Sequence, residues 1–353
     1  MTKTRVLIVD DSAVVRSVIN EMLSADADIE VVGEAVDPYD ARDKIKQLRP
    51  DVLTLDVEMP KMDGITFLRN LMKLNPMPVV MLSTLTQEGA DVTLQALELG
   101  AVDFIGKPVA TSLDSHLENF QTDLINKVKA AAGASQKLRF RRSRPEPAER
   151  VAAPALVSRD RAREQQRVIA IGSSTGGTEA LRDLLNKLPT NMPPIVIAQH
   201  IPASFSERFA NRLNTVCDLT VKEAKDGDVL ETGHVYIAPG SQHLMVKKHG
   251  LKMVCRLEDS DPVNRHKPSV EVLFNSLLDM QAPHVTALML TGMGEDGAMA
   301  MKRLADAGAH TIAQDEASSL VWGMPGAAVK YGAAREVVAL PKIAGRLMQH
   351  LNR

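Results

Sequence analysis

The sequence has little of several things that mark particular classes of protein. Its 353 residues include only 2 cysteines, Cys217 and Cys255, so a disulfide framework is not expected. The formal net charge of −2 gives no general reason to bind nucleic acid or an anionic membrane. No apolar run approaches the ~18 residues of a membrane span, and the amino terminus has no signal-peptide pattern. We therefore expect a cytoplasmic protein with no nucleic-acid partner and no direct membrane insertion.

What is present is typical of a globular protein. Apolar residues make up 44% and charged residues 24% of the chain, which are ordinary values. At about 150 residues per domain, the length predicts two domains. Both are expected to be α/β, because short apolar runs alternate with helical patterns along the whole chain.

The first predicted domain covers residues 1–131. Its apolar segments are rich in Val, Leu and Ile, which suits parallel strands that are buried on both faces. We predict a doubly wound, flavodoxin-like parallel sheet with five strands, at 6–9, 30–32, 52–55, 79–82 and 102–105.

Chemically active side chains follow these predicted strands. Asp10 and Asp11 come directly after the first strand, Asp56 after the third, Ser83 after the fourth and Lys107 after the fifth. The carboxyl ends of parallel strands meet at one edge of a sheet, and three carboxylates there repel one another unless a hard cation such as Mg²⁺ lies among them. Each acid alone could instead be a helix N-cap. The set together predicts a phosphoryl-transfer site.

These segments resemble the receiver domain of two-component response regulators. The resemblance is carried by Leu7–Ser12, Leu55–Pro60, Asp63-Gly64, Ser83 and Lys107. It implies that Asp56 accepts a phosphoryl group. It also implies that Asp10, Asp11 and Asp56, with the backbone carbonyl of Glu58, hold Mg²⁺ in the receiver domain.

The same resemblance implies how the receiver signals. Ser83 would follow the phosphoryl group, with Lys107 as its salt-bridge partner. Phe104 stands at the family's aromatic switch position and is expected to turn inward on activation. The phosphodonor would be a chemotaxis histidine kinase.

Residues 132–166 are predicted to be an interdomain linker. The helical periodicity stops near Ala131, and arginines and prolines follow, which is typical of a solvated connection. A basic run of this kind could also contact nucleic acid. The single aromatic residue there, Phe140, offers no stacking platform, so we favour the linker.

The second predicted domain covers residues 167–353. Parallel strands are predicted at 168–171, 195–198, 286–290 and 310–313, with helices at 205–213, 269–280, 297–307 and 343–351. The strand at 234–238 and the hairpin of 244–246 with 251–255 are predicted to form an antiparallel excursion. The domain is thus expected to have a mainly parallel sheet with an antiparallel hairpin.

A sharp turn after the strand at 168–171 has the pattern of a nucleophile elbow. Gly172–Gly176 fits Gly-x-Ser-x-Gly, in which small residues permit a bend that raises the central serine, Ser174, above the sheet. A glycine-rich turn before a helix can also cradle a phosphate, so partners must decide. A phosphate- or nucleotide-binding module stays open on this pattern alone.

Two further strand ends supply such partners. His200 follows the strand at 195–198, and Asp296 lies in the glycine-rich turn after the strand at 286–290. A serine hydroxyl becomes a nucleophile when an imidazole takes its proton, and a carboxylate on the other ring nitrogen orients that imidazole. Glu295 and Asp315 compete with Asp296, and other histidines compete with His200. No cysteine–histidine cluster has zinc-ligand spacing, so no metal is expected here.

The second half resembles the catalytic domain of the CheB family of chemotaxis methylesterases. The resemblance is carried by Ile171–Thr178, Gln199-His200, Ile237–Gly240, Asn264–Ser269 and Leu290–Gly297. It implies hydrolysis of glutamate methyl esters on chemoreceptors and deamidation of glutamines, and hence chemotactic adaptation. Ser174, His200 and Asp296 match the family triad.

The resemblance also implies that Thr175 and Met293 bound the site and its oxyanion environment. Ser173 is a hydroxyl where a small side chain is expected.

A transcriptional regulator is the other class that joins a receiver to an output domain. That class needs a helix-turn-helix, whereas an α/β output half is predicted here. Phosphorylation of Asp56 is expected to raise the activity of the hydrolase half.

Overall fold

The computed structural model describes residues 3–84, 87–107, 114–142, 166–250 and 252–352. The chain forms two compact units, Met1–Glu146 and Pro147–Arg353. Each unit is described by itself below. Residues 143–165 of the predicted linker lie outside the described residues, and the predicted domain limits stay predictions.

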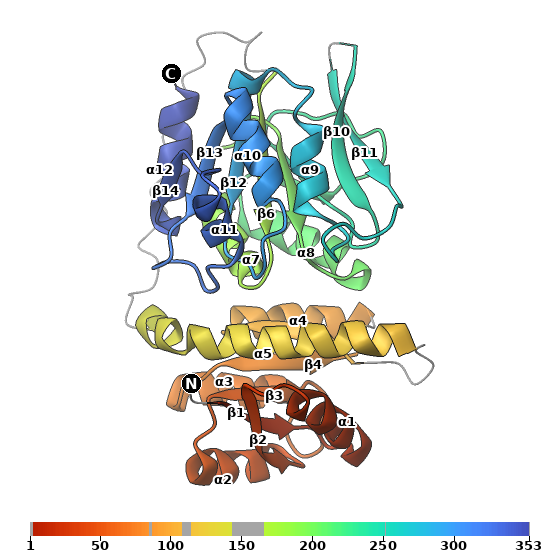
Figure 1. Cartoon of the computed structure of the whole chain (residues 1–353), viewed down its shortest axis with the longest axis vertical. Coiled ribbons are helices and arrows are strands. Elements are labelled where there is room, and N and C mark those ends of the chain that lie inside the picture. Colours follow the sequence, from red (N-terminus) through yellow and green to blue (C-terminus); the bar gives the residue numbers. More distant parts are fainter. Residues whose placement is uncertain (1–2, 85–86, 108–113, 143–165, 251, 353) are drawn as a thin grey trace. The chain divides into compact units, whose positions relative to one another are not determined.

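The first unit is built on a parallel sheet (Figure 1). The described strands lie in the order β2-β1-β3-β4-β5, and each neighbouring pair is parallel, which confirms the doubly wound, flavodoxin-like prediction. The strands are β1 (Thr4–Val9), β2 (Ile29–Ala35), β3 (Val52–Asp56), β4 (Val79–Ser83) and β5 (Asp103–Gly106). The helices are α1 (Ala13–Ser24), α2 (Pro38–Leu48), α3 (Gly64–Leu74), α4 (Gln87–Glu98) and α5 (Asp114–Arg142).

Helix α5 continues past the predicted end of the helix. The apolar periodicity stops near Ala131, but the helix runs to Arg142. The sequence after Ala131 contains no proline before Pro145 and is rich in good helix formers, so the backbone has no reason to stop there. Ala131 and Ala134 are both buried. The loss of apolar periodicity therefore did not mark the end of the helix.

The second unit is built on a larger parallel sheet. Its described strands lie in the order β14-β13-β12-β6-β7-β9-β8, with parallel pairing throughout. The strands are β6 (Val168–Ser173), β7 (Ile195–Gln199), β8 (Thr220–Glu223), β9 (His234–Ile237), β12 (Val285–Met289), β13 (His310–Gln314) and β14 (Glu336–Val338). A separate antiparallel hairpin is formed by β10 (His243–His249) and β11 (Lys252–Glu258).

The predicted antiparallel excursion was partly wrong. Strand β9 belongs to the main sheet, where it lies between β7 and β8 and is parallel to both. Only β10 and β11 form the antiparallel pair. A short turn, in which Gln242 N–H donates to Pro239 O at 3.3 Å, leads from β9 into the hairpin, which forms a separate sheet. Edge strands β8 and β14 were not predicted, because they are short and most of their residues are not buried.

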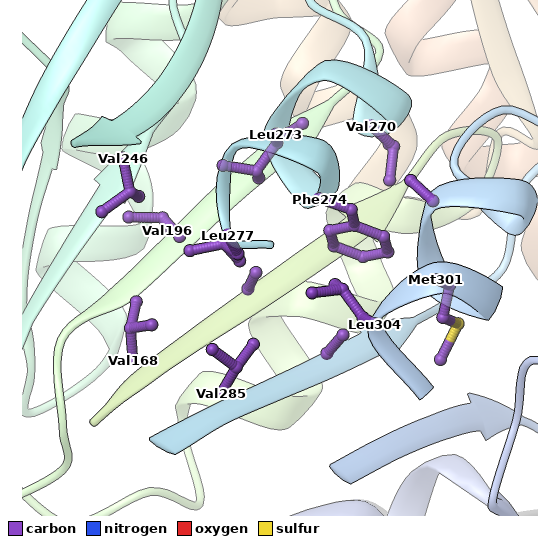
Figure 2. Close-up of a cluster of buried hydrophobic side chains, with 14 of the residues drawn as sticks. Val168, Val196, Val246, Val270, Leu273, Phe274, Leu277, Val285, Met301 and Leu304 are labelled. Atoms are coloured by element: carbon purple, nitrogen blue, oxygen red, sulfur yellow. The ribbon is translucent and has the colours of Figure 1, made fainter. Parts of the chain in front are cut away.

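The second unit's helices are α7 (Gly177–Leu185), α8 (Ala203–Val216), α9 (Val270–Ser276), the 3₁₀ turn η1 (Ala282–His284), α10 (Ala298–Ala307), α11 (Met324–Lys330) and α12 (Leu340–Leu351). Helices α9 and α10 cover one face of the sheet, and Figure 2 shows Phe274 and Leu304 pointing toward the strands. Val168, Val196 and Val285 face them from β6, β7 and β12. Burying such side chains stabilises the unit by about 2 kcal/mol each. This packing fixes the strands whose ends carry the site.

Among the described residues, no helix is both long enough and apolar enough to span a bilayer.

Candidate functional site

In the first unit, the predicted acidic residues and the lysine come together at the carboxyl edge of the sheet. Carboxylate oxygens of Asp10, Asp11 and Asp56 lie within 4.8 Å of one another. Lys107 Nζ is 2.8 Å from Asp10 Oδ2 and 2.8 Å from Asp56 Oδ1. Asp10 and Asp56 are buried, whereas Asp11 is exposed, so the cluster opens to solvent on one side.

Burial and neighbouring charges shift the pKa values of Asp56 and Lys107 in this cluster. Burial raises the pKa of Asp56 to about 6, against the opposing effect of Lys107. Burial acts to lower the pKa of Lys107, but its bonds to Asp10 and Asp56 raise it overall. Apart from Lys107, buried Asp10 Oδ2 meets no donor among the described residues. An all-oxygen set with excess negative charge fits Mg²⁺.

The remaining receiver residues have these surroundings. Glu58 lies in the exposed loop after β3, and its backbone N–H hydrogen-bonds the Asp56 carboxylate. The Ser83 hydroxyl is buried and lies 2.7 Å from Thr93 Oγ1 of α4. Phe104 is 4% exposed, and Lys127 Nζ lies 5.4 Å from the centre of its ring. The Phe104 side chain is already buried in this structure, and its turn on activation stays a prediction.

In the second unit, Ser174 lies in the tight turn between β6 and α7. Gly176 in this turn has a φ of 75°, which favours glycine. Ser174 N–H donates to Thr291 O at 3.1 Å, so the turn is tied to the segment after β12. A side chain at Gly292 would place its Cβ 2.9 Å from Ser174 Cβ. Glycine there permits the two strand ends to approach closely.

Strand β7 and the β12–α10 turn bring a histidine and an aspartate together. His200 Nε2 lies 2.9 Å from Asp296 Oδ2, and both side chains are nearly buried. With Nε2–H donated to the carboxylate, the neutral ring keeps its lone pair on Nδ1. His200 Nδ1 is buried and has no hydrogen-bond partner among the described residues. Since His200 N–H donates to Ser173 O, this unused acceptor belongs to a residue joined to the serine turn, as a general base requires.

Asp296 is held by several donors besides His200. Its Oδ2 accepts from Val270 N–H at 2.7 Å, and its Oδ1 accepts from Asn264 Nδ2 at 2.8 Å and from Ser269 Oγ at 2.9 Å. Burial opposes ionisation, but the bond to His200 and these donors lower the pKa of Asp296 to about 2. The carboxylate is therefore charged at neutral pH.

The loop before α9 supplies partners to which sequence analysis assigned no role. Besides Asn264 and Ser269, it carries His266, whose ring stacks on the His200 ring with centroids 3.7 Å apart and planes 11° apart. Val263 and His266 close the loop through mutual backbone hydrogen bonds, and Asn264 has a φ of 52°. The motif Asn264–Ser269 was noted as part of a resemblance, but spacing alone did not show that it converges on Asp296.

The competing acids point elsewhere. Glu295 is exposed and accepts from the Tyr331 hydroxyl at 2.7 Å, while Asp315 accepts from Ser318 N–H at 3.0 Å. Thr175 is buried, and its carbonyl accepts from Thr291 Oγ1 at 3.0 Å. Met293 is half-buried between Gly292 and Gly294, in the turn that touches Ser174.

Comparison with known proteins bears on both units. The CheB methylesterase family matches residues 169–347, and the response regulator receiver domain family matches residues 6–115. The chain belongs to the CheB methylesterase family. It is 54% identical to protein-glutamate methylesterase/protein-glutamine glutaminase 1 of Xanthomonas euvesicatoria, over 98% of this chain and 97% of the relative.

Other relatives agree with this family membership. The protein-glutamate methylesterase/protein-glutamine glutaminase of Hydrogenovibrio crunogenus is 49% identical over 99% of both chains. The crystal structure of the Thermotoga maritima CheB methylesterase catalytic domain is 37% identical with a TM-score of 0.50, and the match covers 52% of this chain and 97% of that one. The receiver and methylesterase resemblances found in the sequence are confirmed at the level of the family.

Proposed function

We propose that this chain is a phosphorylation-activated, cytoplasmic hydrolase that removes methyl esters from glutamates of chemoreceptors and deamidates glutamines, and so mediates chemotactic adaptation. The observation that carries the proposal is the His200–Asp296 pair: the two side chains are 2.9 Å apart, His200 Nδ1 is buried and has no hydrogen-bond partner among the described residues, and His200 N–H donates to Ser173 O, next to Ser174. The relatives' names give the two activities.

In the proposed reaction, Ser174, His200 and Asp296 act as a triad. His200 Nδ1 takes the hydroxyl proton as Ser174 Oγ attacks the ester carbonyl, and Asp296 stabilises the resulting imidazolium. The tetrahedral oxyanion collapses, the C–O bond to methoxide breaks, and His200 returns the proton so that methanol leaves. A water, deprotonated by the same nitrogen, hydrolyses the acyl-serine. Thr175 and Met293 bound the space for the oxyanion.

Deamidation follows the same course at the same site. A primary amide also passes through a tetrahedral oxyanion, and His200 would protonate the departing ammonia in place of methanol. Asp296 stays ionised throughout, because its pKa is about 2. No additional residue is required for the second activity.

Regulation is assigned to the first unit. Asp56 would accept a phosphoryl group from a chemotaxis histidine kinase, and Lys107 would pair with the modified side chain. Asp10, Asp11 and Asp56, with the Glu58 carbonyl, would hold Mg²⁺, whose charge would offset that of the phosphoryl oxygens. The Ser83 hydroxyl, now beside Thr93, would move toward the phosphoryl group and so couple α4 to phosphorylation.

Methanol release from methylated receptor membranes tests the proposal. The full chain with Mg²⁺ and a small phosphodonor should release methanol, and the Ser174→Ala variant should release none above the blank. Hydrolysis that persists in Ser174→Ala would assign the reaction to another residue. No methanol from the wild-type chain on any methylated receptor would refute the proposed function.

A further inference from the structure

Gln199 ends strand β7 directly before His200, and its side chain is 3% exposed. The amide nitrogen donates to Ser174 O at 3.0 Å and to His200 O at 3.0 Å. The amide oxygen accepts from Ser173 Oγ at 2.7 Å. Both N–H groups and the carbonyl oxygen of this one side chain are therefore used, and all three bonds go to residues of the two catalytic turns.

These bonds continue the strand pairing beyond the point where the sheet ends. The parallel register of β6 and β7 closes with Ser173 opposite Gln199, and His200 N–H then donates to Ser173 O at 3.1 Å. Past this point the two strands diverge. Strand β6 leads into the turn that carries Ser174, and β7 leads toward α8. The Gln199 amide nitrogen donates to the backbone carbonyl oxygens of both Ser174 and His200, so one planar group links the two diverging segments.

The start of α7 leaves room for this amide because Gly177 has no side chain. A Cβ at Gly177 would lie 2.1 Å from Gln199 Oε1 and 2.8 Å from Ser173 Cβ, so glycine is required where α7 begins. Loss of these bonds would leave buried donors and acceptors without partners, which is unfavourable. The arrangement also accounts for the hydroxyl of Ser173, which is buried and committed to Gln199.

We propose that Gln199 is a positioning residue that sets the separation and angle between Ser174 Oγ and His200 Nδ1. The inference rests on the proposed function, since it assigns Gln199 a role in the same proton transfer. Gln199 does not touch the reacting atoms. It acts through the two backbone carbonyls, and a misplacement of about 1 Å between reacting groups can lower a rate by about 10²-fold.

The test compares four variants with the wild-type full chain in steady-state methanol release from methylated receptor membranes. Gln199→Met keeps the length and apolar volume of the side chain but removes all three hydrogen bonds. Ser173→Ala removes one of them, and a double variant combines the two. Thr311→Val is the matched control, because Thr311 is also fully buried in this sheet and hydrogen-bonded through its hydroxyl, but to Ala333 O.

We expect Gln199→Met to lower kcat about 10- to 100-fold, with KM within about threefold of wild type. The solvent deuterium isotope effect on kcat should rise, because proton transfer from Ser174 to His200 becomes slower. Ser173→Ala should lower kcat a few-fold, and the double variant should be no slower than Gln199→Met, since both changes act on one network. Thr311→Val should lower the unfolding midpoint and leave kcat unchanged.

A folded Gln199→Met with wild-type kcat and isotope effect would overturn the inference. If Gln199→Met does not fold, Ser173→Ala decides, and wild-type kcat in that variant would overturn it equally. The Ser174→Ala variant distinguishes failure of the proposed function from failure of the positioning role. Activity that survives Ser174→Ala would refute the triad whatever Gln199 does, whereas an inactive Ser174→Ala beside a fully active Gln199→Met refutes only the positioning role.

Discussion

Replacing Asp296 with asparagine should separate the electrostatic role of this side chain from its shape. The carboxylate accepts hydrogen bonds from His200, Val270 N–H, Asn264 and Ser269, and donates none. Asparagine has nearly the same shape, but its amide NH₂ group would face N–H or O–H donors and could not accept their hydrogen bonds. We expect Asp296→Asn to lower kcat by about 10⁴-fold, the size of the corresponding effect in serine proteases.

The same change should alter stability in a way that depends on pH. A pKa of about 2 in the folded chain, against 3.8 for a free aspartate, corresponds to about 2 kcal/mol of stability. The folded-state pKa of Asp296 is depressed, so this stability is fully present above the unfolded value. It is lost as pH falls from about 5 toward 2. Asparagine has no such dependence, so the difference between the proteins should shrink in acid.

The chain offers a convenient probe for this measurement. It contains 1 tryptophan, Trp322, and that residue lies in the second unit, so tryptophan fluorescence follows unfolding of the catalytic unit alone. Urea titrations of wild type and Asp296→Asn between pH 7 and pH 3 give the difference in unfolding free energy. Asp183→Asn, where the carboxylate is 40% exposed, is the control and should change little. A difference that stays constant across this range would refute the charge-based account.

Three other outcomes are expected. Ser174→Ala should lower ester hydrolysis by about 10⁴–10⁶-fold in methanol-release assays, and Ser173→Ala far less; the reverse order would mean that the nucleophile is misassigned. Asp56→Asn should stay at the basal rate of methanol release when Mg²⁺ and a small phosphodonor are added, and an increase would place the phosphoacceptor elsewhere. A chain beginning at Arg167 should hydrolyse methylated receptors faster than the unphosphorylated full chain, and an equal rate would show that the receiver does not inhibit.

Much of the fold followed from sequence because buried parallel strands are nearly continuous apolar runs. The segments around Val52–Asp56 and Ile195–Gln199 are of this kind, and both were predicted to within a residue or two. Strand β9 was wrongly predicted to be antiparallel, since a strand does not carry in its own sequence the direction of its neighbour. The end of α5 was missed because helix propensity outlasted the apolar stripe.

The residues of the candidate site also fall into those that could be predicted from sequence and those that could not. Strand-end residues such as Ser174, His200 and Asp296 could be proposed together because topology brings the carboxyl ends of parallel strands to one edge. Asn264 could not, because it reaches Asp296 from an irregular loop 32 positions away, through a left-handed backbone that no period predicts. Gln199 was noted in sequence only as the neighbour of His200, since two of its three hydrogen bonds reach residues 25 and 26 positions earlier in the chain.

The central claim is that one serine site hydrolyses both the ester and the amide under control of the receiver. It is tested most directly by measuring methanol and ammonia release in parallel from the same methylated, glutamine-bearing receptor. The account predicts that a small phosphodonor raises both rates in the wild-type chain and that Ser174→Ala loses both together. Loss of methanol release with ammonia release intact in Ser174→Ala would contradict it.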